Sequence, residues 1–222
     1  MIERIFDHEL AELSDLILKM GVMVQGLIRK SVEALKNQDT KLAQAVIEED
    51  EHVDQMELEI DEKSIQLIAL RQPEASDLRF LTTGMRIATD LERIGDLAED
   101  IAERTVDLSS EPLLKPLVDI PKMAKLAEEG VAAALDAFVK RDSSALESVW
   151  DKEKEVDRLR DAVQLELTEI MGKDAKTVSR ALPLLLVSRH LERISDHATN
   201  IAEDVTYMVE GKVVKHLGRP KT

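Results

Sequence analysis

The sequence predicts an all-α protein built from two tandem, repeated three-helix antiparallel bundles. Three observations support this fold class. One acidic segment occurs twice, at residues 90–103 and 190–203, so one structural unit has been duplicated. Apolar residues recur at spacings of three, four and seven, which is the period of a helix. Only 2% of the residues are aromatic in a chain that is 44% hydrophobic, so the core is aliphatic and an all-β fold is disfavoured.

The duplication extends beyond the acidic segment and divides the chain. Residues 52–54 correspond to residues 155–157 at an offset of 103, and the acidic segments correspond at an offset of 100. Two prolines and two serines between the units are typical of a break in helical structure. The predicted parts are a first bundle at 1–108, a linker at 109–116, a second bundle at 117–211, and a basic tail at 212–222 that we expect to be flexible.

In the first bundle, helices are predicted at about 7–36, 39–72 and 76–106. Asp39 is a plausible N-cap of the second helix, and Pro73 ends it. Gly84 lies on the apolar face of the third helix, where its lack of a side chain would let a neighbouring helix approach closely. Short connections between these helices favour antiparallel packing.

In the second bundle, helices are predicted at about 121–140, 143–171 and 174–209. Asp142 takes the place of Asp39 as an N-cap. Gly172 and Asp174 mark the last break, as the residue after one helix and the N-cap of the next. Helices of about 30 residues are about 45 Å long, so the six helices should form an elongated molecule.

Composition excludes several classes of function. The net charge of −15 argues against nucleic acid as a partner, because phosphate backbones require a basic surface. The chain has no cysteine, so disulfides and thiolate metal sites are excluded. No signal peptide or membrane-spanning run is recognisable, and we expect a cytoplasmic protein. We predict no enzymatic activity, since neither a nucleophile–base pair nor a glycine-rich phosphate loop is present.

Carboxylates follow one flank of the apolar stripe on the second and third predicted helices of each bundle. When two neighbouring antiparallel helices carry acids at the same angle from their apolar stripes, these acids point either into a groove shared by the helices or away from it. No lysine lies on these flanks to neutralise the acids. The candidate metal ligands form four pairs at i and i+4, where two carboxylates lie one turn apart: Asp50 and Asp54, Glu92 and Asp96, Glu153 and Asp157, and Glu192 and Asp196.

Oxygen ligands favour hard cations, such as Mg²⁺, Mn²⁺, Ca²⁺ or iron, over a structural zinc. Acids at this spacing also occur on solvated helix faces, so spacing alone leaves that interpretation open. His52, His190 and His197 point away from the acids, and we expect them to pack or to lie at the surface. Glu49 and His52 form half of a di-iron motif, but the second repeat has no counterpart, which argues against an oxidase.

Arg93 and Arg193 follow the first glutamate of the motif in each repeat. The helical wheel places them on the exposed side, opposite the acidic stripe. They are expected to form surface ion pairs worth less than about 1 kcal/mol, and that side is a candidate partner-binding surface.

Segments 72–79, 86–96 and 189–203, with the opening Phe6-x-x-Glu9-Leu10-x-x-Leu13, resemble the PhoU family. The resemblance covers nearly the whole chain. It implies two three-helix bundles and a non-enzymatic accessory regulator of the phosphate-specific ABC transporter and of the phosphate-starvation response. The implied partners are a PhoR-like sensor histidine kinase, held in its repressing state when phosphate is plentiful, and a PstB-like transporter ATPase. A homodimer is also expected, and contact with the membrane is expected only through partners.

The resemblance also implies metal ions, such as multinuclear iron, on (Glu/Asp)-x-x-x-Asp motifs, with manganese, magnesium or zinc as other candidates. The four acidic pairs above match this motif. Asp96 and Asp100 match it as well, but the second repeat has Asn200, so the two sites are expected to differ. The alternative is a purely structural helical scaffold whose acidic groove binds a basic partner without metal.

Overall fold

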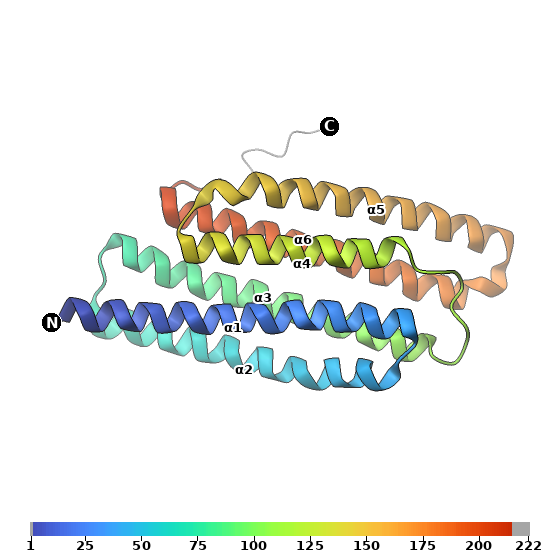
Figure 1. The fold of residues 1–222 in the computed structure, drawn as a ribbon, viewed down its shortest axis with the longest axis horizontal. Helices are drawn as coiled ribbons and strands as arrows, with labels where there is room; N and C mark the ends of the chain where they lie inside the picture. Colours follow the sequence, from blue (N-terminus) through green and yellow to red (C-terminus); the bar gives the residue numbers. More distant parts are fainter. Residues whose placement is uncertain (1, 215–222) are drawn as a thin grey trace.

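The computed structural model describes residues 2–214, and within that range every regular element is a helix (Figure 1). The predicted all-α class is therefore confirmed. None of the helices in this range is both long enough and apolar enough to cross a membrane. Most of the predicted basic tail, from residue 215 onward, lies outside the described residues. The long helices are α1 (Ile2–Asn37), α2 (Thr40–Arg71), α3 (Ala75–Leu108), α4 (Asp119–Lys140), α5 (Leu146–Lys173) and α6 (Val178–Glu210), with single 3₁₀ turns η1 (Ser143–Ala145) and η2 (Ala175–Thr177).

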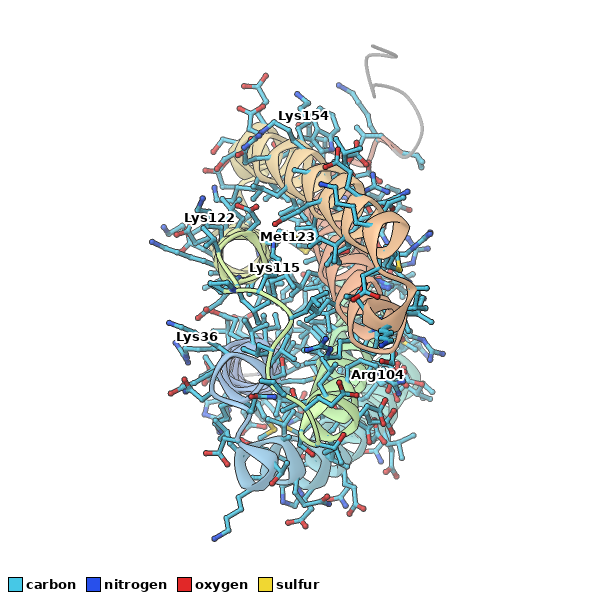
Figure 2. The ribbon with its side chains drawn as sticks, turned by 90° about the vertical axis from the view of Figure 1, so that its right-hand side faces the viewer. Lys36, Arg104, Lys115, Lys122, Met123 and Lys154 are labelled. Atoms are coloured by element: carbon cyan, nitrogen blue, oxygen red, sulfur yellow. The ribbon has the colours of Figure 1, made fainter. Side chains whose placement is uncertain are left out.

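The two repeats, α1–α3 and α4–α6, lie side by side over most of their length, with a stagger along the long axis (Figure 1). Helix α3 packs against α6 and α1 packs against α4, while α2 and α5 are the outermost helices. Figure 2, which views the molecule from one end, shows the two groups of helices one above the other. The exposed side chains of Lys36, Lys122 and Lys154 reach outward from α1, α4 and α5 in this view.

Helix boundaries follow local capping signals. The Asp39 carboxylate accepts hydrogen bonds from the backbone N–H groups of Lys41 and Leu42, both at 3.0 Å, which satisfies donors at the start of α2. At the other end of α2, Gln72 takes a left-handed conformation with φ 50° and Pro73 follows, so the helix cannot continue. The predictions for Asp39 and Pro73 are confirmed.

The boundary between α5 and α6 is predicted only in part. Asp174 caps η2 by accepting from Lys176 N–H at 3.0 Å, as Asp142 caps η1 by accepting from Ser144 N–H at 2.9 Å. The prediction that Gly172 lies beyond the helix is wrong, because α5 runs to Lys173. The Asp174 N–H still bonds to the Ile170 carbonyl at 3.1 Å, so the helical hydrogen bonds extend past the glycine.

The apolar side chains of both repeats form one continuous core. Glycines allow helices to approach closely at two places: a Cβ on Gly84 would lie 3.0 Å from Ile17 Cδ1, and one on Gly21 would overlap the side chain of Leu135 from the other repeat. The stacked rings of Phe80 (α3) and Phe138 (α4) also join the repeats, with centroids 5.1 Å apart. The two bundles therefore share one hydrophobic core.

Polar pairs cross the seam between α3 and α6. His190 and His197, the two histidines at this seam, are partly buried, which agrees with the expectation that they pack or lie at the surface. They also contact acids, which the sequence did not indicate. The pairs are His197 Nδ1 with Asp90 Oδ1 at 2.8 Å, His190 Nδ1 with Asp100 Oδ2 at 3.6 Å, and Arg86 Nη1 with Asp204 Oδ1 at 3.5 Å.

A shared core predicts that a cavity in the first repeat destabilises the second. Ile94, on α3, is fully buried, and Ile94→Ala should lower the free energy of unfolding by about 2–5 kcal/mol. Trp150, the single tryptophan, lies on α5 in the second repeat, so its fluorescence reports on that repeat during urea unfolding. We expect the Trp150 transition and the helix signal in circular dichroism to move together to lower urea.

Leu58→Ala is the matched control, since that side chain is 67% exposed on α2 and its loss should change little. An unchanged Trp150 transition in Ile94→Ala, with a separate early loss of helix signal, would show that the repeats unfold independently.

Candidate metal centre

Acids from α2 and α3 converge in the first repeat. One carboxylate oxygen from each of Asp50, Asp54 and Asp96 lies within 4.8 Å of the other two. Oxygens on opposite sides of a bound Mg²⁺ or Ca²⁺ are separated by about 4–5 Å. The three carboxylates are thus close enough to contact one cation, which corresponds to the first of the two arrangements that the helical wheel left open.

Asp50 is the most confined member of this group. Its side chain is only 4% exposed, and its Oδ1 has no hydrogen-bond partner among the described residues. Gly95 on α3 makes this position accessible, because a Cβ there would lie 2.4 Å from Asp50 Oδ1. A buried carboxylate oxygen normally has a donor or a cation as partner. Asp50 therefore fits a metal ligand better than it fits a solvated acid.

Burial and mutual repulsion both raise the pKa values of carboxylates in this groove. Burial raises the pKa of Asp50 to about 7, and the nearby charges of Asp54, Glu99 and Asp96 act in the same direction. Burial is also the largest cause that raises the pKa of Asp54, Glu92 and Glu99, and other acids of the groove add to it. A group of acids with raised pKa values gains stability from a proton or from a bound cation.

Glu92 and Arg93 lie at the edge of the same groove. Glu92 Oε2 is buried without a hydrogen bond to any described residue, and Arg93 Nε lies 3.3 Å from it. Arg93 Nη1 lies 3.0 Å from Asp96 Oδ2. The prediction that Arg93 lies opposite the acids is wrong, because side chains three residues apart share a helix face. The side chain is 55% exposed, so Arg93 borders the groove without filling it.

The corresponding acids of the second repeat have basic and hydroxyl partners. Arg160 Nη1 lies 3.1 Å from Glu192 Oε1, and its Nη2 lies 3.7 Å from Asp157 Oδ1. Glu153 is buried and accepts a hydrogen bond from Thr199 Oγ1 at 3.0 Å. An arginine therefore neutralises this flank in the second repeat, a contact that the absence of lysine from the flanks did not indicate.

Asp196 is partly exposed on α6, and the acids of the second repeat do not form a three-carboxylate grouping like that of the first among residues 2–214. Arg193 is exposed on the same helix. A role for Arg93 and Arg193 in binding partners stays a prediction.

Three residues that distinguish the acidic groups of the two repeats were not among the predicted site residues: Glu99, Gly95 and Arg160. Glu99 lies close enough to Asp50 to raise its pKa. Aligning the repeats position by position would have revealed them, because Glu99 corresponds to Thr199, Gly95 to Ser195, and Arg160 to Glu57.

A family model described as the PhoU domain matches the chain twice, over residues 17–105 and 120–205. The chain belongs to the PhoU family. A relative from Aquifex aeolicus, described as "Phosphate-specific transport system accessory protein PhoU homolog", is 42% identical over 94% of both chains. A relative from Pseudomonas aeruginosa with the same description is 39% identical over 96% of this chain and 88% of its own.

Solved PhoU structures share the fold. The crystal structure of PhoU from Pseudomonas aeruginosa superposes with a TM-score of 0.89 at 38% identity, covering 93% of this chain and all of that one. The phosphate transport system regulatory protein PhoU from Streptococcus pneumoniae gives a TM-score of 0.87 at 32% identity, covering 94% of this chain and 99% of its own. The duplicated bundle is therefore the PhoU architecture.

The raised pKa of Asp50 predicts that its charge destabilises the metal-free fold at neutral pH. The pKa is raised from 3.8 to about 7, so the cost of ionisation is absent below about pH 4, grows as the pH rises, and is complete above about pH 7. Asp50→Asn cannot ionise. In EDTA, the free energy of unfolding gained by Asp50→Asn should be larger by about 2 kcal/mol at pH 8 than at pH 5.

Glu48→Gln provides the control, because this acid is exposed on the same helix and its effect should not change between the two pH values. A gain from Asp50→Asn that is equal at pH 5 and pH 8 would contradict the raised pKa.

Proposed function

We propose that the chain is a metal-binding regulatory adaptor of phosphate uptake and phosphate-starvation signalling. Membership of the PhoU family, and relatives described as accessory proteins of the phosphate-specific transport system, support the accessory role. The observation that carries the metal-binding part is the buried Asp50 oxygen, which lacks a hydrogen bond from any described residue and lies beside two further carboxylates. In this proposal the chain performs no catalysis.

The first repeat supplies the metal ligands. The ion would be held by Asp50, Asp54 and Asp96. A further carboxylate would come from Glu92, whose Oε2 is buried in the same groove. An all-oxygen set of carboxylates suits iron, manganese or magnesium better than zinc. The bound cation would remove the repulsion across the groove and fix α2 against α3, which is the structural effect that a regulator could transmit to a partner.

The proposed partners are a PstB-like transporter ATPase and a PhoR-like sensor kinase, which the adaptor would hold in its repressing state when phosphate is plentiful. In this proposal the protein acts in the cytoplasm as a homodimer, and it reaches the membrane only through these partners. The exposed arginines Arg93 and Arg193 are candidate contact residues, one in each repeat.

A scaffold that binds a basic partner without metal is the second candidate function. Arg93 favours it, because its guanidinium already lies 3.0 Å from Asp96 at the edge of the groove. A basic side chain of a partner could satisfy the same carboxylates in the way that Arg93 does. The two functions differ in whether partner binding requires metal.

Removal of the two α2 ligands should abolish stoichiometric metal binding. Asp50→Asn/Asp54→Asn keeps the side-chain shapes but removes both charges from the ligand group. Tag-free protein would be stripped with EDTA and reloaded with Mn²⁺ or, without oxygen, with Fe²⁺. Bound metal would then be measured by elemental analysis and by calorimetry. We expect stoichiometric metal in the wild type and none in the variant.

Glu48→Gln/Glu59→Gln removes two exposed charges from the same helix and should keep its metal. Capture of the purified transporter ATPase by each protein, with and without metal, supplies the second measurement. Capture that depends on metal in the wild type supports the adaptor. Equal capture by metal-free and metal-loaded protein supports the scaffold, and absence of metal from the wild type contradicts metal binding.

A further inference from the structure

The two repeats differ in charge at the position where their acids meet. Arg160 on α5 corresponds to Glu57 on α2, so a cation replaces an anion at the same place in the duplicated unit. The Arg160 side chain is 21% exposed and Glu192 is 19% exposed, so this pair is largely removed from solvent. One guanidinium lies within 3.7 Å of two carboxylates that match the proposed metal ligands of the first repeat.

Further differences act in the same direction. Arg189 corresponds to Thr89, so the second repeat carries a further cation near Glu192; burial raises the pKa of Glu192, and the charges of Arg160 and Arg189 oppose that rise. Thr199 corresponds to Glu99, so a hydroxyl that donates to Glu153 replaces another carboxylate. The buried acid of the second repeat therefore has a donor, whereas Oδ1 of Asp50 has none among the described residues.

The first repeat thus gathers six carboxylates, and the second has four carboxylates, one arginine and one threonine at the same positions. The six are Asp50, Asp54, Glu57, Glu92, Asp96 and Glu99, and their counterparts are Glu153, Asp157, Arg160, Glu192, Asp196 and Thr199.

We infer that Arg160 is the resident cation of the second repeat and takes the place of metal there, so that the chain holds metal in its first repeat only. A guanidinium is always charged and presents a fixed fork of donors that suits two carboxylates at once. A metal ion that entered this site would have to displace Arg160 from Glu192 and Asp157, and the guanidinium would keep only Asp161, whose Oδ1 lies 3.0 Å from its Nε. Loss of two carboxylate partners by a largely buried cation is unfavourable. The statement about the first repeat rests on the proposed function, and the statement about Arg160 rests on the contacts of the second repeat.

The two repeats would then respond differently to metal. The second repeat keeps its α5–α6 contact whether or not metal is present, because its cation is covalently part of the chain. The α2–α3 contact of the first repeat changes with metal supply. The single core would join a fixed half to a metal-responsive half.

The test uses a full-length parent variant, Asp50→Asn/Asp54→Asn, in which metal binding by the first repeat is removed. This parent should bind no Mn²⁺ in calorimetry after EDTA treatment, and Mn²⁺ should not shift its melting temperature. Arg160→Glu, added to the parent, restores the acid found at position 57, and it should bind Mn²⁺ and melt at a higher temperature when Mn²⁺ is added. Arg160→Gln removes the cation without adding an acid, and it provides the same readout if the glutamate variant does not fold.

Three outcomes decide whether Arg160 keeps metal out of the second repeat. Binding of Mn²⁺ gained on loss of Arg160 supports the inference. Binding of Mn²⁺ by the parent, with Arg160 intact, overturns it, because metal then enters the second repeat. Absence of binding in both Arg160 variants overturns it as well, since Arg160 would then not be what keeps metal out.

A different result would contradict the proposed function, namely absence of bound metal from the wild-type protein. Asp157→Asn/Glu192→Gln in the otherwise wild-type chain is the matched variant, and it should keep the Mn²⁺ content of the wild type. A content reduced by this variant would also overturn the inference.

Discussion

Burial of negative charge between α2 and α3 is the constraint on which the first repeat depends. Helix α3 packs against α1, α2 and α6, and one of its flanks carries acids. That flank borders α2, and Gly95 removes the side chain that would keep the Asp50 carboxylate away. Asp50 is held against α3 with Asp54 and Asp96 beside it. Such an arrangement is stable when a proton or a cation offsets the repulsion.

The duplicated unit meets the same constraint in two ways. In the second repeat the carboxylates are satisfied from within the chain, by the Arg160 guanidinium and the Thr199 hydroxyl. In the first repeat the corresponding positions carry acids, and Asp50 Oδ1 has no hydrogen-bond partner among the described residues. The repeats share one core, and stacked rings and charge pairs cross between them, so packing contacts join the α2–α3 pair to the second repeat. In the proposed function, this shared core would let a metal ion bound between α2 and α3 affect the second repeat.

The sequence predicted what local chemistry determines. Helical periodicity and the duplication predicted the six helices, and Asp39 capped α2 as expected. The helical wheel put Asp50, Asp54 and Asp96 on matching flanks but left open whether they point into a shared groove, which the packing of α2 against α3 decides. The errors arose where a residue acts beyond its own helix. Arg160 reaches from α5 to α6, which a wheel drawn for one helix cannot show. The pairing of the seam histidines with acids likewise depends on how α3 meets α6, and periodicity carries no information about that contact.

Anomalous diffraction from crystals loaded with Mn²⁺ tests the central claim most directly, because it locates the metal in both repeats at once. The structure predicts anomalous density between α2 and α3, in contact with Asp50, Asp54 and Asp96, and none between α5 and α6, where Arg160 stays between Asp157 and Glu192. Density between α5 and α6, or an empty α2–α3 groove at saturating Mn²⁺, would contradict it.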